Sequence, residues 1–297
     1  MTRMKKYILK PTDPSTKSLP DGFETSLNAA QLEVVKHTNG PLLVIAGAGS
    51  GKTRTLVYRL VRLVHDGVPP PSILLLTFTR KASQEMMRRA TGVLDSRCQN
   101  VAGGTFHSFA NQILREFAQH LGYSNNFTIM DRSDADDLVG KARKAVGDLA
   151  KEKRFPKKRT IAEVISKSIN MSRPVATILE REYPQFWEFA EIIDQIQMSY
   201  IQTKKTMQVM DYDDLLIQLK KLLMEHDEVR QILQTRYRYI MVDEYQDTNL
   251  VQSEIVHLLG DSHKNVMVVG DDSQSIYSFR GANFKNIMEF PQLFAGA

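Results

Sequence analysis

The segment LLVIAGAGSGKTRTL, residues 42–56, limits the possible fold of this chain more than any other stretch. A short apolar run leads into a glycine-rich turn, and Gly51, Lys52 and Thr53 then open a helical stretch. Glycines let the backbone turn tightly, so that several N–H groups can point at one phosphate chain. The amino terminus of the following helix adds a favourable dipole for an anion. The segment therefore predicts a phosphate-binding loop between a buried strand and a helix.

The side chains of this loop predict which phosphates it holds. The pattern G-x-x-x-x-G-K-[ST] is met except at its first position, where Ala46 stands. In such loops the lysine reaches the β- and γ-phosphates and the hydroxyl binds Mg²⁺. An ordinary glycine turn before a helix is the alternative, but it leaves the lysine and the hydroxyl in register unexplained. The predicted nucleotide-binding residues of the loop are Ala48, Gly49, Ser50, Gly51, Lys52 and Thr53.

A second candidate site follows the apolar run Arg238–Asp243, which ends in Asp243 and Glu244. In open α/β sheets, ligands bind at the carboxyl ends of the strands. Asp243 is then the predicted Mg²⁺ partner, with Thr53, and Glu244 the predicted base that deprotonates the attacking water. An acidic pair at a strand end is by itself more often a helix cap or a solvated turn. Together with the phosphate-binding loop, it predicts an enzyme that hydrolyses a nucleoside triphosphate.

The arrangement of apolar runs predicts an α/β fold with a parallel sheet. Short runs without alternation suit strands that are buried on both faces. These runs are Leu42–Ala46, Ile73–Phe78, Arg238–Asp243 and Asn265–Gly270. Lys52–His65 is a predicted crossover helix between the first two, and Leu27–His37 a predicted amphipathic helix.

The middle of the chain differs, because strand-like runs nearly vanish between residues 111 and 233. We predict a helical insertion there, and a discontinuous α/β domain over 23–110 and 234–297, after a flexible leader at 1–22. Several apolar residues in the insertion fall mostly at spacings of three, four and seven, which predicts one helix face. They are Ile178, Phe186, Phe189, Ile193, Ile196 and Tyr200, and we expect Trp187 to lie in the core as well.

Composition adds weak limits. The formal net charge of +5 is compatible with nucleic acid as a partner. Cys98 is the only cysteine, which excludes an intramolecular disulfide and a thiolate metal cluster. No run approaches the ~18 apolar residues of a membrane span, so we expect a cytoplasmic protein without a membrane partner. The basic stretch KEKRFPKKR, residues 151–159, is either a solvated loop, the commoner case, or a loop that contacts phosphates.

Further motifs accompany the two nucleotide-site segments. They are LNAAQ at 27–31, LTFTRKASQEM at 76–86, GTFHSFA at 104–110, VDEYQDTN at 242–249 and VVGDDSQSIYSFRGA at 268–282. In this order and strand context they resemble the helicase motifs of the UvrD/Rep/PcrA group within helicase superfamily 1. The resemblance covers roughly residues 24–290. It implies a RecA-like P-loop NTPase core with an inserted all-helical subdomain, and ATP-driven translocation on single-stranded DNA, usually in the 3′ to 5′ direction.

The resemblance also implies roles in nucleotide binding. Gln31, with Asn28 nearby, would contact the adenine edge, and Arg54 would stack on or near the adenine. Gln274 would sense the γ-phosphate. Asp213 and Asp214, in the motif DYDDLL at 211–216, fit structural caps better than catalysts.

Other motif residues would contact single-stranded DNA or a junction with duplex. Aromatic faces hold bases without reading sequence, and the candidates for such stacking are Phe78, Tyr277 and Phe279. Phe279 stands where many relatives carry tryptophan, so base binding there would be weaker. The candidates for backbone contacts are Thr77, Arg80, Thr105 and His107. Phe106 is expected to be a core residue, and His107 could also be a hydrogen-bonded structural histidine.

The chain ends at FPQLFAGA before a second run of β-α units. The family has a second RecA-like domain, whose arginines are worth ~10³–10⁵ in rate. We therefore expect this chain, as a monomer, to bind ATP and Mg²⁺, to hydrolyse ATP slowly and not to unwind DNA processively. Two alternatives stay open: the motor arm of a helicase–nuclease complex, and an ATP-gated DNA-binding module without turnover.

Overall fold

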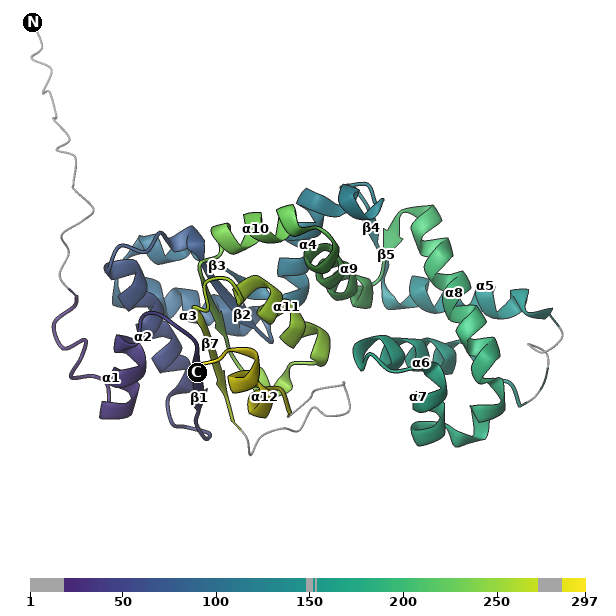
Figure 1. The fold of residues 1–297 in the computed structure, drawn as a ribbon, viewed down its shortest axis with the longest axis horizontal. Coiled ribbons are helices and arrows are strands. Elements are labelled where there is room, and N and C mark those ends of the chain that lie inside the picture. Colours follow the sequence, from purple (N-terminus) through teal and green to yellow (C-terminus); the bar gives the residue numbers. More distant parts are fainter. Residues whose placement is uncertain (1–18, 148–151, 153, 272–284) are drawn as a thin grey trace, which may run out of the picture.

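The core of the molecule is a five-stranded sheet in which every neighbouring pair is parallel (Figure 1). The computed structural model describes residues 19–147, 152, 154–271 and 285–297. The strand order is β1-β7-β6-β2-β3. The strands are β1 (Leu42–Ile45), β7 (Val266–Gly270), β6 (Tyr239–Val242), β2 (Ile73–Thr77) and β3 (Ala102–Thr105). The predicted α/β core with a parallel sheet is confirmed.

Helices cover both faces of this sheet. On one face Ile73 and Leu75 pack in a buried cluster with side chains of α1 (Ala29–Lys36), α2 (Lys52–His65) and α3 (Arg80–Val93). On the other face Leu74 and Leu76 pack with the remaining core helices. These are α4 (Phe106–Phe117), α9 (Tyr212–Glu225), α10 (Asp227–Arg236), α11 (Leu250–Gly260) and α12 (Lys285–Leu293). Burial on both faces explains why β2 reads as a continuous apolar run.

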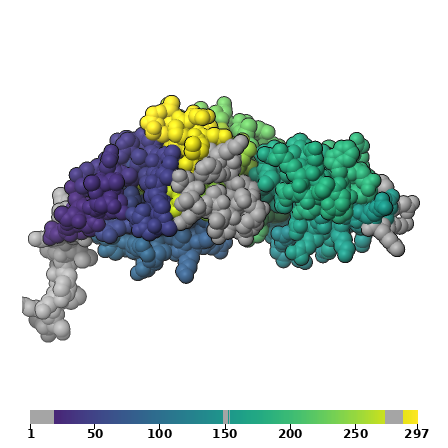
Figure 2. All heavy atoms as spheres, turned by 90° about the horizontal axis from the view of Figure 1, so that it is seen from below, coloured from purple at the N-terminus to yellow at the C-terminus, as the bar shows by residue number. Residues whose placement is uncertain are grey.

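A separate helical cluster lies at one end of the molecule and forms the teal part of Figure 2. Its helices are α5 (Arg132–Ala145), α6 (Lys158–Asn170), α7 (Val175–Glu182) and α8 (Ala190–Met207). A short parallel pair, β4 (Thr128–Ile129) with β5 (Val209–Met210), joins it to the core. The helical cluster covers fewer residues than the predicted insertion over 111–233, because α9 and α10 pack against the sheet and belong to the core.

Two details of the predicted insertion are wrong. The apolar residues expected on one helix face lie on α7, on a 3₁₀ helix at Pro184–Phe189 and on α8. They are divided because α7 ends at Glu182 and the 3₁₀ helix begins at Pro184. Most of them still share one buried cluster. Trp187 is 60% exposed and not part of the core. Among the described residues, no helix is long and apolar enough to span a membrane.

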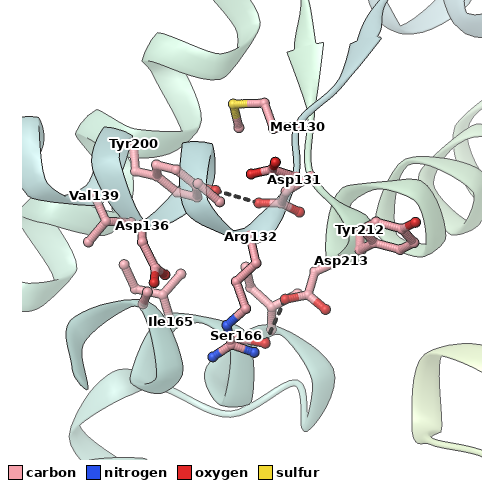
Figure 3. A pocket seen from close by; sticks show the side chains of 14 residues that line it. Met130, Asp131, Arg132, Asp136, Val139, Ile165, Ser166, Tyr200, Tyr212 and Asp213 are labelled. Carbon is pink, nitrogen blue, oxygen red and sulfur yellow. Dashed lines mark hydrogen bonds between the residues drawn. The ribbon is translucent and has the colours of Figure 1, made fainter. Parts of the chain in front are cut away.

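Polar side chains join the helical cluster to the sheet domain. Asp213 in α9 accepts hydrogen bonds from Ser166 Oγ at 2.6 Å and Asn170 Nδ2 at 2.8 Å, both in α6. Asn249, the N-cap of α11, donates from Nδ2 to Asn170 Oδ1 at 3.0 Å. Figure 3 shows the bond between Ser166 and Asp213 in the wall of a pocket between the two parts. Asp213 therefore links helices of the helical cluster and the core.

A buried ion cluster supports the same junction. Lys204 in α8 is almost wholly buried, and its Nζ lies 2.7 Å from Asp211 Oδ2 and 2.6 Å from Asp214 Oδ2. Asp211 and Asp214 also form the capping box of α9, which agrees with the predicted structural role of Asp214. Burial and the neighbouring Asp211 raise the pKa of Asp214 to about 6. Lys204 thus supplies the charge that lets these two carboxylates lie together.

Replacing this lysine should destabilise the fold strongly. Lys204→Met removes the cation and leaves two buried carboxylates without it, a change that typically costs about 3–5 kcal/mol. Urea unfolding monitored by circular dichroism measures the loss. The matched control is Lys205→Met, at an exposed neighbouring position, which should change the free energy of unfolding by less than about 0.5 kcal/mol. Equal stabilities of the two variants would contradict the assigned role.

Candidate functional site

The predicted site segments lie along one edge of the sheet. All five strands run parallel, so their carboxyl ends meet at that edge. The glycine-rich loop follows β1, Asp271 follows β7 and Asp243 follows β6. Phe78 follows β2, and Thr105 ends β3. The strand order therefore puts the phosphate-site residues on one half of the edge and the predicted DNA contacts on the other.

The glycine-rich loop has the backbone that its sequence requires. Gly49 and Gly51 have φ of 76° and 89°, a region that favours glycine. Gln31 Nε2 donates to the Ser50 carbonyl at 2.9 Å, and Asn28 and Gln31 form the capping box of α1. A Cβ at position 51 would lie 2.6 Å from Gln31 Nε2. Gln31 therefore lies against the loop, where it could contact a bound base.

Lys52 begins α2 and lies among carboxylates from two other strands. Its Nζ is 3.2 Å from Asp271 Oδ2 and 3.9 Å from Glu244 Oε2. Asp271 is wholly buried. A buried carboxylate needs a compensating charge, and Lys52 provides it.

Asp243 is buried, and its Oδ1 has no hydrogen-bond partner among the residues that the structure describes. Burial and the neighbouring Glu244 raise the pKa of Asp243 to about 7. Asp247, three positions beyond the base candidate Glu244, has a pKa raised to about 6 by burial and by Glu244. Asp247 Oδ1 is also buried, and the described part of the chain offers it no hydrogen-bond partner. Such carboxylates need a cation, and metal ions often supply the largest local charge.

A pocket of about 490 Å³ brings the predicted metal ligands together. Thr53, Asp243, Glu244 and Asp247 all line it. Mg²⁺ prefers oxygen ligands and binds through one or two carboxylates together with substrate phosphates. The hydroxyl and the unpartnered carboxylate oxygens fit that ion.

Arg54 is exposed, and its guanidinium lies 5.4 Å from the ring centroid of Tyr58. The ring of Phe23 lies 4.8 Å from that of Tyr58. Phe23 is buried, whereas Tyr58 is partly exposed. Arg54 and Tyr58 are therefore the candidate surface for the adenine.

The residues predicted to contact DNA differ in how exposed their side chains are. Phe78 is 38% exposed and Arg80 is also exposed. Thr105 caps α4, and burial lowers the pKa of His107, whose ring lies 5.8 Å from that of Tyr212. Phe106 is a core residue, as expected.

Thr77 does not fit its predicted contact with DNA, because it is wholly buried. Its hydroxyl donates to the Thr79 carbonyl at 2.9 Å. Thr77 therefore shapes the turn after β2 and presents no side-chain surface to DNA.

Gln274, Tyr277 and Phe279 lie outside the described residues. Asp271, Gln246 and Asp247 lie within them and were not among the predicted site residues. Each follows a strand end inside the motif VDEYQDTN or VVGDDSQSIYSFRGA, so position after a buried strand was the available signal.

Comparison with known proteins gives a consistent result. The family model for the UvrD/REP helicase N-terminal domain matches residues 27–295. The ATP-dependent DNA helicase PcrA of Leuconostoc citreum is 38% identical over 288 residues, which cover 95% of this chain and 37% of the relative. PcrA of Staphylococcus epidermidis is 35% identical over 268 residues, covering 90% and 36%. DNA helicase II of Rickettsia typhi is 36% identical over 278 residues, covering 93% and 41%. The chain thus spans about two fifths of the length of these relatives.

The burial of the Asp243 carboxylate yields a stability prediction. In the absence of Mg²⁺ and nucleotide, Asp243→Asn should raise the free energy of unfolding by about 1–3 kcal/mol, because it removes a charge that burial disfavours. Added Mg²⁺ should then stabilise the wild type more than the variant. Thermal unfolding with and without the ion measures both effects. Asp21→Asn, at an exposed position, is the control and should change neither. A variant less stable than the wild type without Mg²⁺ would contradict this view of Asp243.

Proposed function

The chain belongs to the UvrD/REP helicase family, and we propose that it is the ATP-binding and ATP-hydrolysing motor portion of a DNA helicase. We propose further that it acts on single-stranded DNA, with the 3′ to 5′ polarity that the resemblance implies. One observation carries the proposal. Lys52, Glu244 and Asp271 converge from three strand ends, and beside them Asp243 adds a buried carboxylate with one oxygen that has no hydrogen-bond partner among the described residues.

The proposed reaction uses these groups in fixed roles. The Lys52 ammonium and the N–H groups of the loop bind the β- and γ-phosphates. The Glu244 carboxylate takes a proton from water as the water oxygen bonds to the γ-phosphorus, and the bond from that phosphorus to the bridging oxygen breaks. ADP and inorganic phosphate result. Mg²⁺, held by Thr53 and Asp243, would neutralise charge on the phosphate oxygens.

The proposed DNA contacts lie at the carboxyl ends of β2 and β3, on the neighbouring half of the same sheet edge. Phe78 follows β2, which pairs with β6, and it lines the same pocket as Glu244. A base stacked on Phe78 would therefore lie next to the hydrolytic site. Arg80, at the start of α3, is also exposed and could bind the DNA backbone. This closeness offers a direct route for coupling ATP hydrolysis to DNA binding.

Replacing the base candidate should separate binding from hydrolysis. Glu244→Gln removes the proton acceptor, and general-base catalysis contributes about 10²–10⁴-fold, so the rate of residual hydrolysis should fall by about that factor while ATP binding survives. Single-turnover hydrolysis and binding of a fluorescent ATP analogue measure the two properties. Lys52→Ala should lose ATP binding as well. Undiminished hydrolysis in Glu244→Gln would show that another group is the base, and binding without hydrolysis in the wild type would favour an ATP-gated binding module.

Removing the exposed ring of Phe78 should weaken binding of single-stranded DNA. Base–aromatic stacking is worth about 1–3 kcal/mol per base, so Phe78→Ala should raise the Kd for an oligothymidine by about one to two orders of magnitude. Fluorescence anisotropy at fixed salt measures the change. Trp187→Ala is the matched control, since Trp187 is an exposed aromatic on the helical cluster. Equal effects of the two substitutions would count against a specific base contact at Phe78.

A further inference from the structure

Gln246 lies between the candidate base and the end of β7. Its side chain is almost wholly buried. Gln246 Nε2 donates to Glu244 Oε2 at 2.7 Å, and Gln246 Oε1 accepts from the backbone N–H of Asp271 at 3.0 Å. One amide group thus joins the segment after β6 to the segment after β7, with a hydrogen bond at each end.

Close packing holds this amide in place. A Cβ at Gly270 would lie 2.9 Å from Gln246 Oε1 and 2.9 Å from Ile287 Cδ1. Gly270 has an ordinary backbone conformation, so the close approach of the Gln246 side chain, not a positive φ, explains the glycine. Gln246 therefore packs tightly against the end of β7 through its acceptor end.

Glu244 needs such support. It has φ of 51° and ψ of 49°, a left-handed conformation that costs a non-glycine residue about 1–3 kcal/mol. Its side chain is 36% exposed, and its cationic neighbour Lys52 is 3.9 Å away. When Lys52 binds phosphate, that contact need not persist. Gln246 has no phosphate to bind and can keep its hydrogen bonds.

We propose that Gln246 is a positioning residue, whose amide holds the Glu244 carboxylate in the orientation that receives the proton of the attacking water. The inference rests on the proposed function, in which Glu244 is the base. The hydrogen bond at the other end of the amide ties this orientation to Asp271, the partner of Lys52. Gln246 thus fixes the position of the Glu244 carboxylate relative to Asp271 and, through Asp271, relative to Lys52.

Two substitutions separate hydrogen bonding from packing. Gln246→Met keeps the length of the side chain and removes both hydrogen bonds. Gln246→Glu keeps an acceptor for the Asp271 N–H and, at pH 8, puts a second carboxylate where the donor to Glu244 was. The rate of single-turnover ATP hydrolysis, with protein in excess and oligothymidine present, should fall about 10- to 100-fold in both, as with other supporting residues. The Kd for a fluorescent ATP analogue should stay at the wild-type value.

Two further proteins make the test specific. Gln202→Met, at an exposed position of α8, is the matched control and should hydrolyse ATP as the wild type does. In a Glu244→Gln background, Gln246→Met should cause no additional loss, because residues that act through one group are not additive. An additional loss there would show that Gln246 does not act through Glu244.

The remaining outcomes also decide the matter. A wild-type rate in Gln246→Met would overturn this inference and leave the proposed function intact. Equal losses of ATP binding and of hydrolysis in Gln246→Met would make Gln246 a structural residue. If the wild type bound ATP without hydrolysing it, the proposed function would fail and this inference with it.

Discussion

The ammonium group of Lys52 is the charge on which the arrangement of the site depends. Asp271 is wholly buried at the end of β7, and Glu244 follows the neighbouring strand β6. Without a cation, the buried carboxylate of Asp271 would carry a charge in surroundings that solvate it poorly, with a second carboxylate nearby. Because β1, β7 and β6 are adjacent and parallel, the loop after β1 delivers Lys52 to both. The order of the strands therefore places the Lys52 ammonium beside both carboxylates. The glycine-rich loop that carries Lys52 keeps a backbone that suits phosphate binding.

Elements whose cause is local could be predicted from the sequence. The crossover helix has the predicted bounds, Lys52–His65, because a glycine turn starts it and an amphipathic pattern continues to its end. The buried strands were also predictable, since short apolar runs bounded by glycine or polar residues suit strands that are buried on both faces. Strand β3 is the exception, because Gly103 and Gly104 interrupt its apolar character and it lies at the edge of the sheet.

The rest of the site could not be predicted, because it depends on contacts between distant segments. Gln246 and Asp271 are visible in the sequence as polar residues after strands, but nothing local shows that they share a hydrogen bond. That follows only from the pairing of β6 with β7. The same holds for Thr77, whose burial depends on the turn after β2 and on β3. In the helical region, Pro184 begins a 3₁₀ helix, so apolar residues spaced as on an α-helix no longer lie on one face of a single helix.

The pairing of β4 with β5 has a consequence for how such a chain can diversify. Thr128 lies opposite Val209, so the strands that lead into and out of the helical cluster lie side by side where they join the core. The two ends of the intervening segment are therefore held together whatever lies between them, and the entropy of closing a loop grows only slowly with its length. The helical cluster is therefore an insertion whose two ends are held at one fixed place on the core. Its length and surface can be exchanged between proteins while the register of the central sheet, and with it the spacing of Lys52, Glu244 and Asp271, stays the same.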